Sequence, residues 1–135
     1  MAWVTPKTNW TADDFIEVAD WDRIRMNLEF LRELACIYFP GFTISPTEEK
    51  TRKSWLYAKD LNAIEDNLAA VNAKSAQLNI GEQQIYQPNG YCIDYVELNR
   101  IESACVRLYD KLRLYINSLL YADNELYADD SIGII

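Results

Sequence analysis

The sequence predicts an all-α fold in which three helices form a bundle. At 135 residues the chain is long enough for one domain with a hydrophobic core and too short for two ordinary domains. Hydrophobic residues make up 50% of it, which argues against intrinsic disorder. Three segments also share one spacing of apolar residues that is typical of packed helices. We expect residues 1–120 to form the bundle, with short accessory helices, and residues 121–135 to form a non-helical tail that is extended or turn-rich.

The three related segments span residues 19–38, 59–78 and 96–119. Near its start each has an acidic residue, a large apolar residue, Asp or Asn, one variable residue and Ile. The apolar residues then recur at alternating steps of three and four, which is a heptad pattern. The positions are Trp21, Ile24, Leu28, Leu31, Ala35 and Tyr38; Leu61, Ile64, Leu68, Val71, Ser75 and Leu78; and Leu98, Ile101, Cys105, Leu108, Leu112, Tyr115 and Leu119. Three such stripes can cover one another in a three-helix bundle.

Local signals delimit the first helix and a shorter one after it. Thr11 and Asp14 have the spacing of a capping box and predict a short N-terminal turn. Residues 39–41, Phe-Pro-Gly, end the first helix, because proline cannot continue a helix and glycine suits its exit. Residues 45–48, Ser-Pro-Thr-Glu, form a capping box with proline at the first helical position. They predict a short helix that runs to about Trp55.

The longest connection is expected at residues 79–90, which contain glycine, proline and an Asn-Gly turn signal. Asp94 and Glu97 have capping-box spacing at the start of the third helix. The acids Asp20, Asp60 and Glu97 fall in the first turns of the three helices, where they complement the helix dipole. We therefore expect these acids to cap helices rather than to catalyse a reaction.

Asn27 and Asn67 occupy equivalent places beside the stripes of the first two segments, and Ala104 takes this place in the third. An amide there either bonds across helices and sets their register or lies on a solvated flank. The sequence leaves both interpretations open.

The C-terminal residues follow a different pattern. Leu120, Leu126 and Ile132 recur with a period of six, which fits an extended chain better than a helix. Paired Asp residues and a glycine favour turns. The apolar end, residues 132–135, is expected to dock on the bundle or on another chain. The acids of this tail do not have the spacing of a calcium-binding loop, so we expect no metal site among Asp123, Glu125, Asp129 and Asp130.

Composition and cysteine spacing argue against several classes of function. The formal net charge of −8 disfavours nucleic-acid binding, which needs Lys and Arg to neutralise phosphates. The chain contains no histidine, the commonest general base and metal ligand. Cys36, Cys92 and Cys105 have no CxxC spacing, so we interpret them as small buried hydrophobic residues. We expect no catalytic residue, no cofactor and no metal.

The first ten residues have neither the basic nor the apolar region of a signal peptide. No apolar run approaches the length of about 18 residues that a membrane-spanning helix needs. We therefore expect synthesis in a reducing cytoplasm and no membrane partner.

Two motifs resemble a known group of proteins. The first is W-x-TPKT-x-W, which matches Trp3, residues 5–8 and Trp10; the second is D-[YL]-N-R-I-x-N-N-[IL]-x-[YF]-L, which each segment matches in part. Together they resemble virion proteins of phages and prophages of Firmicutes. Asp22, Ala63, Ser103 and Ala104 depart from the second motif, where Asn, Arg, Asn and Asn are usual. The resemblance implies a structural module of the tail or baseplate, made in the bacterial cytoplasm and carried in the virion.

The leading prediction is therefore a non-enzymatic virion module that acts by protein–protein contact, as a homo-oligomer or with other tail proteins. The alternative is a carbohydrate-binding or cell-wall-binding module, because exposed aromatic side chains can stack on sugar rings. Aromatic residues at the predicted helix ends have a second interpretation as packing residues. The candidate interaction surface comprises Trp3, Trp10, Trp55, Tyr57, Tyr86, Tyr91, Leu126, Tyr127, Ile132, Ile134 and Ile135.

Overall fold

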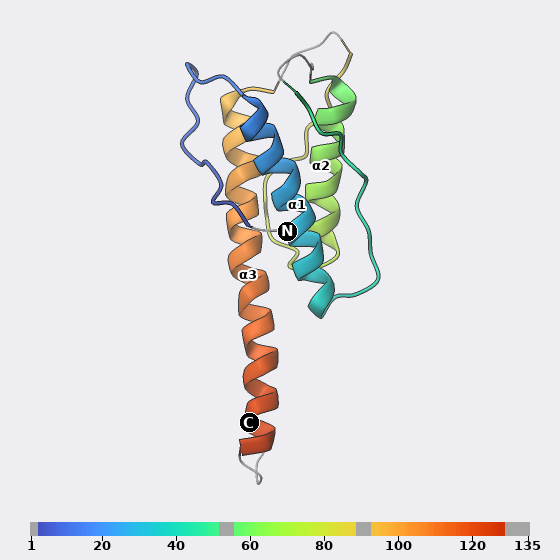
Figure 1. Cartoon of the computed structure of the whole chain (residues 1–135), viewed down its shortest axis with the longest axis vertical. Helices are drawn as coiled ribbons and strands as arrows, with labels where there is room; N and C mark the ends of the chain where they lie inside the picture. Colours follow the sequence, from blue (N-terminus) through green and yellow to red (C-terminus); the bar gives the residue numbers. More distant parts are fainter. Residues whose placement is uncertain (1–2, 52–55, 89–92, 129–135) are drawn as a thin grey trace.

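The computed structural model describes residues 3–51, 56–88 and 93–128, and within these ranges the chain forms helices and no strand (Figure 1). Helix α1 spans Val18–Tyr38, α2 spans Ala58–Ala73 and α3 spans Tyr95–Ala128. The all-α class predicted from the sequence is confirmed for this part of the chain. The acids Asp20, Asp60 and Glu97 lie in the three first turns, as predicted.

All three helices contact one another around one hydrophobic core. The first five positions of each predicted stripe are buried, from Trp21 to Ala35, from Leu61 to Ser75 and from Leu98 to Leu112. The sixth positions are more exposed, and Tyr38 is the most open of them. The apolar stripes are therefore less buried at the end of the molecule where α1 stops.

The three helices run in the same direction, so that all of them begin at one end of the molecule (Figure 1). Arg23, near the start of α1, contacts Glu102, near the start of α3. At the other end, the ring of Tyr38 lies 5.5 Å from that of Tyr115. Parallel helices need connections that return along their full length, which explains why residues 39–57 and 74–94 are long.

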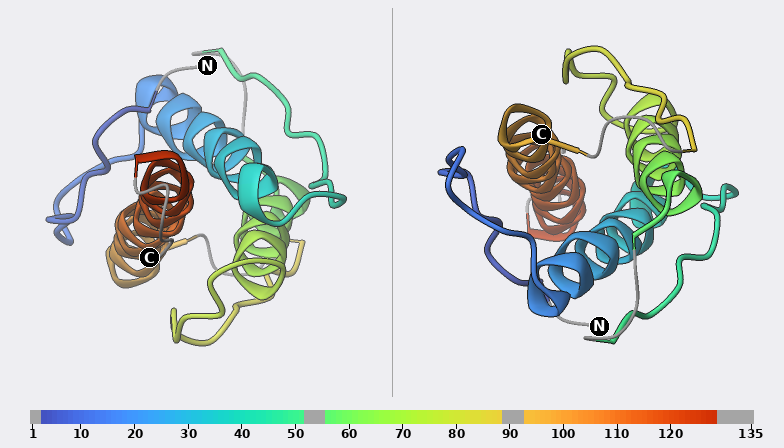
Figure 2. Two further views of the ribbon diagram at one scale, coloured as in Figure 1. Left: turned by 90° about the horizontal axis from the view of Figure 1, so that it is seen from below. Right: turned by 90° about the horizontal axis from the view of Figure 1, so that it is seen from above.

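Three irregular segments lie along the outside of the helices, and we call them the extended segments: residues 3–10, 42–50 and 78–88 (Figure 2). The first contacts α1 and α3, the second contacts α1 and α2, and the third contacts α2 and α3. Each extended segment thus bridges a different pair of helices.

The expectation of a non-helical tail is wrong for residues 121–128, which continue α3. This stretch contains no proline or glycine, and Leu, Ala and Glu are good helix formers. The alternating steps of three and four also continue from Leu119 to Ala122 and Leu126, and the period of six obscured them. Residues 129–135, with Ile132, Ile134 and Ile135, lie outside the described residues.

The predicted short helix after Ser45 is wrong for residues 45–51, which are irregular. The backbone N–H and carbonyl of Ser45 both bond to the side chain of Asn67. Asn67 thus pairs with Ser45 as a neighbouring strand would, and the chain continues along α1 and α2 as an irregular segment. Of the accessory helices, only a turn at Thr11–Asp14 forms in the described ranges, closed by a 3.1 Å bond from the Asp14 N–H to the Thr11 carbonyl.

The second helix ends earlier than residue 78. Asn72 bonds to both backbone groups of Leu78, and Gln77 adopts a positive φ of 52°. The chain therefore reverses within residues 74–78, which the stripe of apolar residues did not reveal. Among the described residues, no helix has both the length and the hydrophobicity to span a membrane.

Candidate functional site

Asparagine side chains fasten the extended segments to the helices. The amide of Asn27 donates to the Val4 carbonyl at 2.7 Å, and its oxygen accepts from the Val4 N–H at 3.0 Å. The same two bonds, all of 2.8–3.0 Å, join Asn99 to Trp10, Asn62 to Tyr86, Asn67 to Ser45 and Asn72 to Leu78. One amide carries both a donor and an acceptor, so it satisfies both backbone groups of a residue, as a neighbouring strand would.

Four of these asparagines occupy two positions of the repeated motif. Asn62 and Asn99 are equivalent, and Asn27 and Asn67 are equivalent. Asn27 and Asn67 are buried and bond to extended segments rather than to neighbouring helices. Neither interpretation from the sequence, a helix-to-helix bond or a solvated flank, is therefore correct.

Glu102 is a buried carboxylate that accepts four hydrogen bonds. Its Oε1 accepts from the Lys7 N–H at 3.1 Å and from Arg23 Nε at 2.7 Å. Its Oε2 accepts from Trp10 Nε1 at 2.5 Å and from another Arg23 nitrogen at 2.8 Å. Bonding to Glu102 raises the pKa of Arg23 above its usual range, so Arg23 stays charged. The cluster joins the first extended segment, α1 and α3 at one point.

Glu65 occupies the equivalent position on α2 and has fewer partners. Its Oε2 accepts from the Tyr86 hydroxyl at 3.0 Å and from Arg100. Its Oε1 is buried and has no hydrogen-bond partner. Burial and the charge of Glu65 raise the pKa of Tyr86 above its usual range, so Tyr86 remains a hydrogen-bond donor. Sequence analysis missed both carboxylates, although each directly follows the Ile of the repeated motif.

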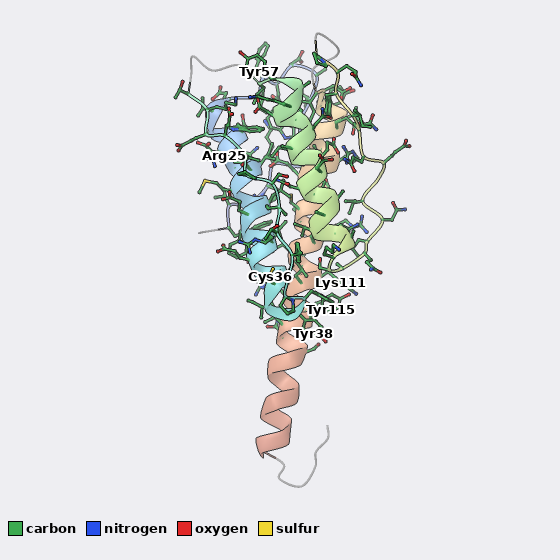
Figure 3. All side chains as sticks on the ribbon, turned by 90° about the vertical axis from the view of Figure 1, so that its right-hand side faces the viewer. Arg25, Cys36, Tyr38, Tyr57, Lys111 and Tyr115 are labelled. Carbon is green, nitrogen blue, oxygen red and sulfur yellow. The ribbon has the colours of Figure 1, made fainter. Side chains whose placement is uncertain are left out.

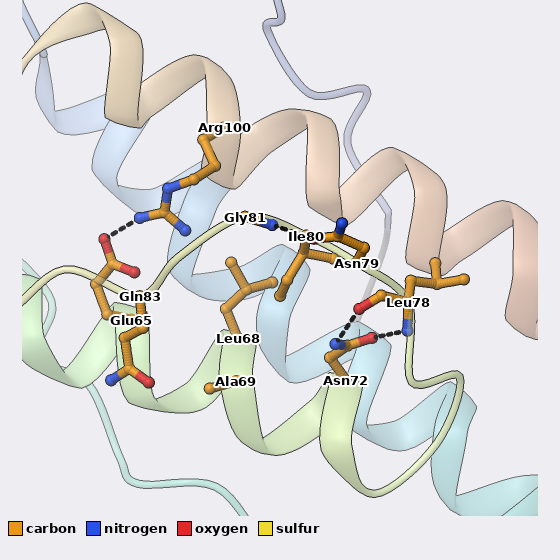
Figure 4. A pocket seen from close by; sticks show the side chains of 10 residues that line it. All are labelled: Glu65, Leu68, Ala69, Asn72, Leu78, Asn79, Ile80, Gly81, Gln83 and Arg100. Atoms are coloured by element: carbon orange, nitrogen blue, oxygen red, sulfur yellow. Dashed lines mark hydrogen bonds and ion pairs between the residues drawn. The ribbon is translucent and has the colours of Figure 1, made fainter.

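A hollow of about 200 Å³ opens beside Glu65, between α2, α3 and the third extended segment (Figure 4). Leu68, Ala69, Leu78 and Ile80 give it an apolar wall. Glu65 lies in its lining together with Arg100.

The last part of α3 extends well past the ends of α1 and α2 (Figures 1 and 3). Where it leaves them, Tyr38, Phe39 and Tyr115 form an aromatic cluster with ring centroids 4.9–5.7 Å apart. Lys111 lies over the Tyr115 ring at 5.3 Å. Leu114, on the same helix, is 61% exposed. An apolar and aromatic surface therefore surrounds the base of the projecting helix.

The structure separates the aromatic residues of the candidate interaction surface. Trp10 and Tyr86 are buried, and their N–H and O–H groups bond to Glu102 and Glu65. Their assignment to an exposed surface is therefore wrong. Trp3 is partly buried and stacks on Tyr109 with the ring centroids 4.1 Å apart. Tyr57 is exposed, at the opposite end from the projecting helix (Figure 3). Trp55 and Tyr91 lie outside the described residues, and only the backbone of Leu126 and Tyr127 is described, within α3.

Two of the cysteines are described. Cys105 is buried in the core, as predicted, and Cys36 is half-buried with its Sγ 3.6 Å from the Phe42 carbonyl. Burial raises the pKa of Cys105 to about 12. In the ranges that the structure describes, no three Asp, Glu or Cys side chains form a group that could hold a metal. Comparison with known protein families, with curated proteins and with solved structures finds no match to this chain.

Proposed function

We propose that this protein is a non-enzymatic structural module that joins other copies of itself through the projecting part of α3. The observation that carries the proposal is the length of α3 beyond the end of α1. Tyr38, the last residue of α1, lies beside Tyr115, and α3 continues from there to Ala128. At 1.5 Å per residue, the part after Tyr115 is about 20 Å long.

A helix of this length is marginal by itself in water, and most helical stability in proteins comes from packing an apolar face. The apolar positions of the third stripe continue in the sequence at Leu119, Ala122 and Leu126. A second copy presents the same stripe, so two or more projecting helices can bury it against one another in a coiled coil. Association of identical helices in this way gives a closed symmetric oligomer, which is the usual form of homo-oligomers.

We further propose the tail or baseplate of a phage particle as the setting. This part rests on the resemblance of the two motifs to virion proteins, and the structural partners would then be other tail proteins. The alternative of a carbohydrate-binding module has less support, because Trp10 and Tyr86 are buried and Trp3 is stacked on Tyr109.

The test of self-association is light scattering on the full chain and on a chain that ends at Asn117. We expect the full chain to be oligomeric at tens of micromolar and the shortened chain to be monomeric. Tryptophan fluorescence should be alike in both, because Trp10 and Trp21 lie in the core. A monomeric full chain at this concentration contradicts the proposal.

A matched pair of substitutions separates the stripe from the rest of the helix. Leu126→Glu should shift the full chain toward monomer, whereas Asn124→Glu, which is off the stripe, should leave the oligomer intact. Equal effects of the two substitutions contradict association through the stripe. The virion setting has a separate test, mass spectrometry of purified phage particles from the source bacterium. We expect peptides of this chain in the particles, and their absence contradicts that part of the proposal.

A further inference from the structure

The surface at the base of the projecting helix is apolar, and part of it is open to solvent. Figure 3 shows Tyr38, Tyr115 and Lys111 together where α3 leaves the other helices. Tyr38 is 44% exposed and its neighbour Ile37 is 60% exposed, so α1 ends in two large apolar side chains that water reaches. We call Ile37, Tyr38, Phe39, Lys111 and Tyr115 the base surface. Exposed apolar side chains that lie together are typical of a protein–protein contact.

The charge of α3 changes sign along its length. Residues 107–113 contain three cations and one acid, whereas residues 114–128 contain two acids and no cation. Two of the cations, Lys111 and Arg113, each lie over an aromatic ring, 5.3 Å from its centroid, and within the described residues neither forms an ion pair. The two acids are Asp123 and Glu125. The helix is therefore basic at the base surface and acidic toward its far end.

These charges distinguish the two orientations in which a pair of projecting helices can associate. In a parallel pair, the acids of one helix lie beside the same acids of the other, and like charges repel. In an antiparallel pair, the acidic far end of each helix lies beside the base surface of the other, and opposite charges attract. Electrostatic complementarity therefore favours the antiparallel pair.

The length of the projecting part fits this arrangement. The two stripes overlap fully when Leu126 of one copy lies opposite Tyr115 of the other. At 1.5 Å per residue, Glu125 then lies about 5 Å along the helix axis from Arg113 and about 8 Å from Lys111. The long side chains of the two cations can span these offsets.

We propose that the base surface binds the acidic far end of α3 from a second copy, so that two projecting helices pair in antiparallel orientation. This inference rests on the self-association proposed above and adds the partner site and the direction. A pair with twofold symmetry forms the contact twice, because the same surface is used on both copies. Leu126, at the far end of the stripe, would cover the open side of the rings of Tyr38 and Tyr115.

Small-angle X-ray scattering of the full chain measures the orientation directly. An antiparallel pair carries one helical bundle at each end and is about 80 Å long, whereas a parallel pair has its bundles side by side and is about 50 Å long. We expect the longer particle. An oligomer of the shorter length overturns this inference and leaves self-association standing, whereas a monomer contradicts both.

Charge reversal at each end tests the contact itself. Lys111→Glu with Arg113→Glu reverses the base surface, and Asp123→Lys with Glu125→Lys reverses the far end. By sedimentation equilibrium, we expect each double variant to raise the dissociation constant of the pair about tenfold. The chain with all four substitutions should return to within about threefold of the original constant, because the opposite charges meet again. Failure of this chain to recover overturns the inference.

The two double variants also control for net charge, because they change it in opposite directions. A general charge effect would weaken association in one and strengthen it in the other, and this result contradicts a local contact. In a parallel pair the two reversed sites lie about 15–20 Å apart along the helix, so the four substitutions together would restore nothing. Lys59→Glu is the matched control, because Lys59 is 68% exposed near the start of α2, and it should leave the constant unchanged. Unaltered tryptophan fluorescence shows that each variant keeps its core.

Discussion

At the scale of single residues, five asparagines supply hydrogen bonds to backbone that lies outside the helices and has no neighbouring strand. Three of them serve the two connections that parallel helices require, and two serve the N-terminal extended segment. The sequence placed Asn27 and Asn67 at equivalent positions, but it did not reveal their partners. Val4 and Ser45 are 23 and 22 residues away in the chain, so only the course of the extended segments brings them near. The sequence also did not reveal that Glu65 Oε1 lacks a hydrogen-bond partner, because this depends on which carboxylates the nitrogens of Arg100 contact.

We predict that Asn27→Ala lowers the free energy of unfolding by about 2–3 kcal/mol. Alanine removes a donor and an acceptor and leaves the N–H and carbonyl of Val4 without these partners. Urea denaturation monitored by tryptophan fluorescence measures the loss. Asn117→Ala is the control, because Asn117 is exposed on α3, and it should change the stability by less than about 0.5 kcal/mol. Similar losses in the two variants would refute a special role of Asn27.

At the scale of elements, the apolar spacing predicted the existence and the starting points of all three helices to within one residue. Their ends were less predictable. The side chain of Asn72 stops α2, and good helix formers carry α3 through Ala128 despite the two Leu-Tyr-Ala-Asp repeats. Helix direction was not predictable either, because a stripe of apolar residues looks the same in parallel and antiparallel packing. In the connections, two glycines with positive φ, Gly41 and Gly81, allow the chain to turn.

We expect Gly81→Ala to destabilise the protein more than Gly41→Ala. Both substitutions place alanine at a positive φ, which costs about 1 kcal/mol. At Gly41 the added Cβ meets nothing within 4 Å, whereas at Gly81 it also collides with the Arg100 side chain. Thermal or urea unfolding of the two variants gives the difference directly, and we expect it to be about 1 kcal/mol. Equal losses would show that Arg100 moves aside without cost.

At the scale of the whole molecule, the shared direction of the helices gathers three positive helix ends on one side. Asp20, Asp60 and Glu97 lie there in the first turns, and each forms an ion pair with Arg23, Lys50 or Arg100. The three acids thus complement three parallel dipoles, and because each is paired with a cation they do not account for the net charge of −8. The helices enclose one hydrophobic core, so we expect the protein to unfold in one cooperative transition with a single free energy of unfolding.

That stability should fall as the solution becomes alkaline. The pKa of Cys105 is raised from its ordinary value of 9.0 to about 12 in the folded protein. Its contribution is therefore complete below about pH 9 and is lost as the pH rises toward 12, because the unfolded chain releases the proton first. The slope is at most about 1.4 kcal/mol per pH unit. The raised pKa of Tyr86 acts in the same direction above about pH 10.

Urea denaturation between pH 8 and about pH 9.5 measures this slope where the contribution of tyrosine ionisation is still small. Cys105→Ala removes the thiol and should flatten the dependence in this window, even though the variant is less stable at every pH. An unchanged slope in Cys105→Ala would rule out the buried thiol as its source.

The asparagine bonds have a consequence for hydrogen exchange. Amide protons in irregular connections usually exchange quickly, and those in helices slowly. Here the amide protons of Val4, Trp10, Ser45, Leu78 and Tyr86 are all held by asparagine side chains anchored on helices. Their release requires a segment to detach from the two helices that it bridges. A map of slowly exchanging amides would therefore trace six elements rather than three, and in the extended segments the slow positions would be isolated residues separated by fast ones.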